Sequence, residues 1–186
     1  MPVKPILKDI RERMIKAEQH FVHELAGVRT GKASTALVEN IQVEAYGAVM
    51  RIREIASITT PEPRLLLIQP WDASLAPAIE KAILKSNLGL TPVVDNKVVR
   101  IVFPELTTER RQELIKVVRR MAEEARVAIR NLRREAMEQL RKEKKDGALP
   151  EDEERQAEKE LQKITDEFVG KIDDHLKRKE EEIMSV

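Results

Sequence analysis

Apolar residues recur every three or four positions through the first thirty residues, with charged residues between them. The apolar positions are Leu7, Ile10, Met14, Ala17, Phe21, Leu25 and Val28. This spacing corresponds to one face of an α-helix, so it predicts an amphipathic helix from Ile6 to Val28. The stretch RTGKAS, which contains Gly31, is expected to end that helix.

The same period returns after Thr107 and continues nearly to the end of the chain. A second helix is predicted over residues 107–146, with Thr107 or Thr108 as its N-cap. Gly147 and Pro150, in DGALPEDEE, predict a break before a third helix. The apolar positions are Leu114, Val118, Met121, Ala125, Ala128, Leu132, Ala136 and Leu140 in the second helix, and Ala157, Leu161, Ile164, Phe168, Ile172, Leu176 and Ile183 in the third. None of the three helices can bury its stripe alone, which predicts a three-helix bundle.

The periodicity changes between the first two helices. IQVEAYG, REIASITT, RLLLIQP and VVRIVFP are typical of short strands, and SLAPAIEKAILKSNLG predicts a helix that ends at Gly89. Residues 31–106 therefore predict a small α/β domain of four to six strands and one helix. It is inserted into a bundle formed by residues 1–30 and 107–186, which makes the fold class α+β. Trp71 is expected to pack in the core of the small domain.

The inserted domain is joined to the bundle through two chain connections. Two parallel connections permit bending between domains and resist free rotation, so the sequence predicts a hinge. Its residues are Arg29, Thr30, Gly31, Pro104, Glu105, Leu106 and Thr107.

Composition supports long helices and excludes some classes of protein. Charged residues make up 36% of the chain and aromatic residues only 3%. There is no cysteine, which excludes disulfides and thiolate metal sites. The first residues, MPVKPILKDIRERM, lack the apolar core of a signal peptide, and no apolar run reaches membrane-spanning length. We therefore expect a soluble, cytoplasmic protein that does not enter a membrane.

The net charge of +1 is the sum over segments of opposite charge. Residues 107–149 carry thirteen basic and eight acidic groups, whereas residues 150–186 carry seven basic and thirteen acidic groups. The local charges are therefore +5 and −6, while residues 31–106 are neutral. Charge separated along the chain in this way suggests a surface that binds an anionic partner.

Seven of the thirteen basic groups of the second helix also gather on one side of it. They are Arg119, Arg126, Arg130, Arg133, Arg134, Arg141 and Lys144. Successive residues of a helix are rotated by about 100°, and on this basis the side chains of these cations fall within an arc of about 100°. Glu123 is the one acidic residue of the helix in the same arc. The arc lies away from the apolar stripe, and arginine suits bidentate contact with phosphate. Because no aromatic residue alternates with these cations, we expect contact with the backbone of folded RNA rather than stacking on bases.

The sequence offers no set of residues for covalent chemistry. His20 and His23 lie three residues apart on the first helix, without further ligands that would complete a metal site. No nucleophile, base and orienting group occur in a recognisable pattern, so we expect no enzyme activity, no metal and no cofactor. An RNA-binding factor and an adaptor that binds acidic protein surfaces both remain compatible with the charge pattern.

Four segments resemble the bacterial ribosome recycling factor family in order and spacing. They are VRTGKAS, AIEKAILKSNLGLTP, PELTTERRQEL and ARVAIRNLRRE, and the resemblance extends over essentially the whole chain. Lys32 stands where the family usually has Arg, which keeps the positive charge.

The resemblance implies a fold, a function and partners. The fold would be a long three-helix bundle and a smaller β/α/β domain, arranged in an L similar in outline to tRNA. The protein would bind the ribosome after termination, with the bundle on large-subunit RNA. Elongation factor G would engage the small domain, and its GTP hydrolysis would drive separation of the subunits, with release of mRNA and tRNA. A bundle closed by its own three helices is expected to be monomeric.

The resemblance also assigns site residues. The family's ribosomal RNA contacts would fall on Arg130, Arg133 and Arg29. The helical arc adds Arg126, Arg134 and Arg141, and it places Arg133 at the centre of the cationic surface.

Overall fold

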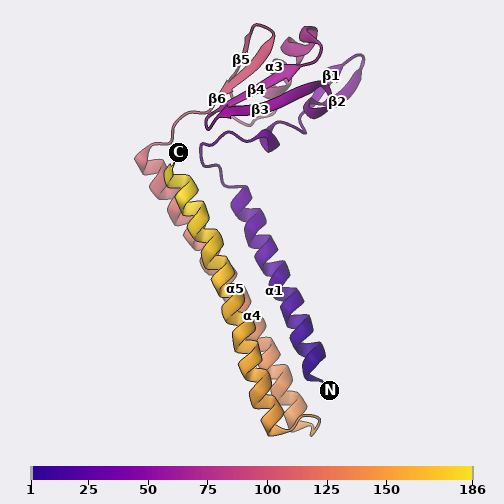
Figure 1. Ribbon diagram of the computed structural model, residues 1–186, viewed down its shortest axis with the longest axis vertical. Coiled ribbons are helices and arrows are strands. Elements are labelled where there is room, and N and C mark those ends of the chain that lie inside the picture. The colour runs from indigo at the N-terminus through magenta and orange to yellow at the C-terminus, as the bar shows by residue number, and fades with distance from the viewer. Residues whose placement is uncertain (1, 186) are drawn as a thin grey trace. The chain divides into compact units, whose positions relative to one another are not determined.

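A computed structural model describes residues 2–185 of the chain, and their contacts divide the chain into two compact units. The larger unit contains the residues up to Arg29 together with Thr108–Ser185, and the smaller unit is Thr30–Thr107. The larger unit is helical and the smaller contains all six strands of the described residues (Figure 1). The predicted α+β class is confirmed.

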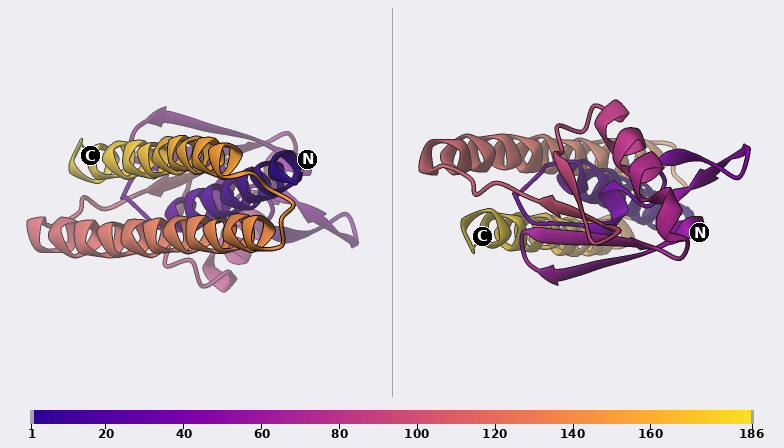
Figure 2. Two further views of the ribbon diagram at one scale, coloured as in Figure 1. Left: turned by 90° about the horizontal axis from the view of Figure 1, so that it is seen from below. Right: turned by 90° about the horizontal axis from the view of Figure 1, so that it is seen from above.

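Three long helices form the larger unit. They are α1 (Val3–Ala26), α4 (Thr108–Lys145) and α5 (Glu151–Ser185). Each packs against the other two along its length (Figures 1 and 2). A short turn joins α4 to the antiparallel α5, and its Gly147 adopts a φ of +79°, a backbone conformation that favours glycine.

The core of the bundle departs from the predicted stripe at two points of α4, and side-chain size accounts for the one at Ala128 and Ile129. Ile129 and Ala122 are fully buried, whereas Ala128, which was predicted to face the core, is exposed. The prediction was wrong there because Ala128 and Ile129 are adjacent apolar residues that fit a helical period almost equally well. The larger side chain removes more apolar area from water, so Ile129 faces the core.

Two predicted helix ends were also too late. The first helix ends at Ala26, where Gly27 donates its backbone N–H to the carbonyl oxygen of Glu24 at 3.1 Å, so Gly31 does not terminate it. The helix of the smaller unit ends at Lys85, four residues before Gly89. In both cases the carbonyls of the last turn find capping donors earlier than the glycine that marked the expected end.

The smaller unit contains a hairpin and a four-stranded antiparallel sheet. The hairpin pairs β1 (Gln42–Ala45) with β2 (Ala48–Arg51). The sheet has the order β3-β4-β6-β5, formed by β3 (Ala56–Glu62), β4 (Leu65–Pro70), β6 (Val98–Val102) and β5 (Pro92–Asp95). The helices are α2 (Ile52–Ile55) and α3 (Ala76–Lys85), with single 3₁₀ turns at Thr35–Leu37 and Ala73–Leu75. The stretch REIASITT, predicted as strand throughout, begins instead with α2.

Apolar residues of β4, β6 and α3 form the core of the smaller unit. Leu66, Ile68, Ile79 and Ile101 are fully buried in it. Two-residue turns with positive φ at both positions connect β1 to β2 at Tyr46 and Gly47, and β5 to β6. These turns match the twist of the strands that they join, and they fix the register of each hairpin.

The two chain connections of the smaller unit are held by one turn of its sheet. Ala33 donates its backbone N–H to the carbonyl oxygen of Pro63 at 2.7 Å, and Phe103 donates to that of Arg64 at 2.8 Å. Pro63 and Arg64 form the turn between β3 and β4, so the entering and leaving segments lie beside each other. Residues 30–32 and 104–107 are the parts of the two connections that lie outside these hydrogen bonds.

Replacing Gly31 by alanine is expected to destabilise the smaller unit by about 1 to 2 kcal/mol. Gly31 has a φ of +80°, and an added Cβ would lie 3.0 Å from Cγ of Leu106. Gly47→Ala is the matched control, because its φ is +74° and nothing lies within 4 Å of its added Cβ. Urea denaturation of both variants should show the larger loss for Gly31→Ala. Equal losses would mean that the contact with Leu106 contributes nothing.

Candidate nucleic-acid interface

The predicted cationic surface of α4 consists of two rows with different surroundings. The inner row, Arg119, Arg126 and Arg133, lies on the flank of α4 that faces α5. The outer row, Arg130, Arg134 and Arg141, lies farther around the helix and is exposed to solvent.

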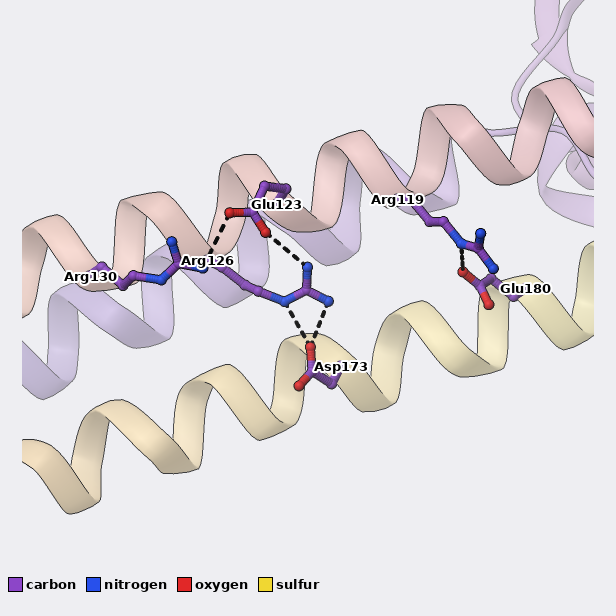
Figure 3. A network of polar contacts seen from close by, with 6 residues as sticks. All are labelled: Arg119, Glu123, Arg126, Arg130, Asp173 and Glu180. Atoms are coloured by element: carbon purple, nitrogen blue, oxygen red, sulfur yellow. Dashed lines mark hydrogen bonds and ion pairs between the residues drawn. The ribbon is translucent and has the colours of Figure 1, made fainter.

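The inner row binds acidic and amide groups of α5, and Figure 3 shows the contacts of Arg119 and Arg126. Arg119 Nε donates to Glu180 Oε1 at 2.7 Å. Arg126 Nε donates to Asp173 Oδ1 at 2.8 Å, and its side chain is only 21% exposed. Arg133 donates to Gln162 Oε1 at 3.2 Å, and Gln162 in turn donates to Asp166 Oδ1 at 2.8 Å.

The first two contacts share a spacing of seven residues. Arg119 and Arg126 are seven residues apart on α4, and their acidic partners on the antiparallel α5, Glu180 and Asp173, are seven residues apart in the reverse direction. Arg133 departs from this spacing, because its partner Gln162 lies eleven residues from Asp173. Flanking charges of this kind fix the register of paired helices. The inner row therefore links the flank of α4 to α5. The sequence carried this signal in the spacing of the α5 acids, which the prediction from α4 alone did not use.

The coupling between Arg126 and Asp173 is expected to be about 0.5 to 1 kcal/mol at low salt and smaller at high salt. The guanidinium is shielded, whereas the carboxylate side chain is 53% exposed, so the solvent screens much of the attraction. A double-mutant cycle with Arg126→Ala and Asp173→Ala, followed by urea denaturation, measures the coupling. The exposed pair Arg155 and Glu151 within α5 is the control and should give a smaller value. A larger coupling in the control would contradict this assignment.

The outer row keeps most of its charge available to solvent. Arg130 is 50% exposed and shares Glu123 with Arg126, at 3.2 Å in both cases. The hydrogen bond from Arg126 is the largest of several effects that lower the pKa of the Glu123 carboxyl. Arg134 and Arg141 are exposed, and within residues 2–185 neither forms a hydrogen bond or an ion pair. Within the described residues, Arg134 and Arg141 are therefore unpaired, whereas Arg130 shares one carboxylate with Arg126.

The remaining predicted cations have separate positions. Lys144 pairs with the nearly buried Glu154 of α5 at 3.1 Å, near the turn that joins α4 to α5. Arg29 is exposed and follows α1 at the boundary of the larger unit. The structure thus brings Arg130, Arg134 and Arg141 together on one exposed flank, whereas it directs Arg126 and Arg133 toward α5.

The sequence profile of a family described as "Ribosome recycling factor" matches residues 21–184. Curated relatives described as ribosome-recycling factors match almost the whole chain. The protein of Carboxydothermus hydrogenoformans is 50% identical over 184 residues, which cover 99% of this chain and 100% of the relative. This chain belongs to the ribosome recycling factor family. A relative from Symbiobacterium thermophilum is also 50% identical, over 98% of this chain and 99% of its own length.

Solved structures of the family match over the full chain as well. A solution structure of the ribosome recycling factor is 44% identical, with a TM-score of 0.77, and the match covers 100% of this chain and 99% of that one. A second structure describes the Thermus thermophilus ribosome recycling factor and Escherichia coli elongation factor G bound to the E. coli post-termination complex. Its matching chain is 47% identical, with a TM-score of 0.64, and 99% of this chain and all of that one are covered.

The described residues contain neither a candidate membrane span nor a candidate metal site. Across residues 2–185, no helix is long and apolar enough to cross a membrane. Over the same residues, no three histidine or acidic side chains are placed to hold a metal ion together.

Trp71 does not pack in the core, contrary to the prediction. Its side chain is 71% exposed, and Tyr46, at the tip of the β1–β2 hairpin, is 70% exposed. The Tyr46 hydroxyl donates to Asp72 Oδ2 at 2.9 Å, which ties the hairpin to the segment that follows β4. Trp71 lies just beyond the buried end of β4, where strand alternation directs it outward after Pro70.

The pKa of the Asp72 carboxyl is expected to rise toward its usual value of 3.8 when Ser74 is replaced by alanine. The Ser74 hydroxyl and backbone N–H donate to Asp72 Oδ1 at 2.7 and 3.0 Å, and together with the Tyr46 hydroxyl they lower this pKa. Because the folded pKa is depressed, the stabilisation is present above pH 3.8 and is lost as the pH falls through the folded pKa. Carboxyl-carbon NMR titration measures the midpoint. Tyr46→Phe should produce a smaller rise, and an unchanged midpoint in Ser74→Ala would contradict the assignment.

Proposed function

We propose that this protein acts in ribosome recycling after translation termination. It binds the post-termination ribosome and, together with elongation factor G and GTP hydrolysed by that factor, splits it into subunits with release of mRNA and tRNA. Membership of the family over the whole chain supports this proposal, as does the related chain described in the complex with elongation factor G on the post-termination complex. On this proposal the protein works in the cytoplasm as a monomer.

The proposal that the protein binds ribosomal RNA is supported mainly by the exposed outer row. Arg130, Arg134 and Arg141 present guanidinium groups along several turns of a packed helix, which is suited to phosphates of folded RNA such as the large-subunit RNA. Arg133, Arg126 and Arg29 stay as predicted contacts. For Arg126 and Arg133, contact with RNA would have to compete with their partners on α5.

The mechanism that we propose is mechanical and involves no covalent step by this chain, no metal and no cofactor. The bundle anchors to the ribosome, and elongation factor G applies force to the smaller unit. The hinge residues Arg29, Thr30 and Gly31, with residues 104–107, would transmit this force. The anchoring of Ala33 and Phe103 to a single turn supports a short hinge. A distance between fluorophores on the two units that stays fixed in solution and on the ribosome would contradict the hinge.

Light scattering of purified post-termination ribosomes tests the proposed function. Addition of this protein, elongation factor G and GTP should lower the scattering, and omission of any one of the three should abolish the decrease. Absence of a decrease with an active elongation factor would contradict the proposal. The alternative, an adaptor that binds acidic protein surfaces, would then be tested with nuclease. A bound partner that survives nuclease treatment is a protein and supports the adaptor.

A further inference from the structure

A groove in the smaller unit, separate from both arginine rows, follows the open edge of β1. It has a volume of about 550 Å³, within the range of pockets that bind small ligands or peptide segments. Strand β1 forms one wall and helix α3 forms the other. The residues that line it include Gln42 and Glu44 of β1 and Ala78, Lys81, Ala82 and Lys85 of α3.

The backbone of β1 is unpaired on the side of this groove. The β1–β2 hairpin has a two-residue turn, so Ala45 and Ala48 form its closing hydrogen-bonded pair. Antiparallel strands alternate, and the N–H and C=O groups of Gln42 and Glu44 therefore point away from β2. Within residues 2–185, those groups form no hydrogen bond to another element. An open edge of this kind is a template for one more strand.

The α3 wall adds space and positive charge. Ala78 and Ala82 are half-buried and lie four residues apart on the helix, so their small side chains leave room beside the strand. Lys81 and Lys85 are exposed with the same spacing, and neither forms an ion pair among residues 2–185. Against them the groove offers one acid, Glu44, so its net charge is positive.

We propose that this groove binds an extended acidic peptide segment of a partner protein, which adds to β1 as a further strand. Its backbone would pair with Gln42 and Glu44, which present alternating donors and acceptors. Small apolar side chains of the segment would face Ala78 and Ala82, while carboxylates would reach Lys81 and Lys85. A phosphate group only accepts hydrogen bonds, so RNA could pair the β1 carbonyls only through its 2′-hydroxyls or bases. A peptide strand matches both the donors and the acceptors of the edge at their regular spacing, so the edge favours a peptide over RNA.

A blocked hexapeptide of alternating glutamate and valine, added to the isotope-labelled full-length protein, tests this inference by NMR. The amides of Gln42 and Glu44 should show the largest shifts and slower hydrogen exchange. No binding would overturn the proposal. Equal binding of a lysine–valine peptide would overturn the acidic class. Shifts of the same amides by oligouridylate and not by the peptide would overturn it in favour of nucleic acid.

A matched pair of proline variants locates the binding edge. Glu44→Pro removes an outward N–H on the groove side and should weaken peptide binding about fivefold to tenfold. Val49→Pro does the same at the cross-strand partner of Glu44, on the opposite edge of the hairpin, and should leave binding unchanged. Equal effects of the two variants would overturn the assignment to β1.

A charge variant of α3 tests peptide binding in the groove even if the proline substitutions perturb the hairpin. Lys81→Glu combined with Lys85→Glu leaves the β1 backbone intact and should weaken the glutamate–valine peptide at least about tenfold. Unchanged binding would overturn the role of α3. The inference goes beyond the proposed function, and it is measured without ribosomes, so either can fail without the other.

Discussion

Charge reversal of both Arg134 and Arg141 is expected to weaken binding to the post-termination ribosome by about tenfold to a hundredfold. Both side chains are exposed and have no partner within residues 2–185, so their charge is available for phosphate. If each contacts one phosphate, the slope of log affinity against log salt concentration should also fall by about 2. Binding of a fluorescent variant to purified ribosomes over a range of salt concentrations measures both quantities.

A double reversal elsewhere in the larger unit controls for net charge. Lys163→Glu with Lys177→Glu changes the net charge by the same amount at two exposed positions of α5. This control should retain its affinity and its salt dependence. Equal weakening of the two double variants would show that net charge matters and the position of the outer row does not. Helical content should be unchanged in both, because neither pair packs in the core.

Reversal of Arg133 is a less direct test, although the sequence placed that residue at the centre of the surface. Arg133 is half-buried and donates to Gln162, which itself binds Asp166. A glutamate at position 133 would face that acidic neighbour, so loss of binding would mix a loss of phosphate contact with a disturbed α4–α5 interface. Arg134 and Arg141 separate these two effects.

The main elements could be predicted because their signals are long. The helices α4 and α5 each repeat the apolar period over many turns, and Gly147 and Pro150 mark the break between them. Shorter signals in the insert were weaker. Strands β2 and β5 and helix α2 escaped prediction because each has only four residues, and tertiary packing decides the conformation of such short segments.

The division of the arginine surface could be predicted only in part. A helical arc gives the angle of each side chain around its own helix, and it does not say which flank the neighbouring helix covers. Arg126 and Arg133 lie nearest the apolar stripe and are drawn to α5, whereas Arg134 and Arg141 lie beyond its reach. The position of α5 was needed to tell one row from the other.

The largest loss of stability is expected from Phe168→Ala, at about 3 to 5 kcal/mol. Phe168 is fully buried among the three helices of the bundle. Its ring also lies 5.6 Å from the guanidinium carbon of Arg11 and 4.7 Å from Nζ of Lys171. Removal of the ring leaves a cavity and deprives both cations of their aromatic partner. Because domains of this size are only marginally stable, a loss of this magnitude should also reduce the fraction of protein able to bind the ribosome.

Urea denaturation followed by circular dichroism measures this loss, and two variants separate its causes. Phe168→Leu keeps most of the buried volume and should cost about 1 to 2 kcal/mol. Arg11→Gln removes one cation from the ring and its ion pair with Glu167, and should cost about 1 kcal/mol or less because that pair is exposed. The amides of the smaller unit should keep their protection from hydrogen exchange in Phe168→Ala, because that unit has a separate core. A loss below about 1 kcal/mol in Phe168→Ala would contradict the central role of this ring in the bundle.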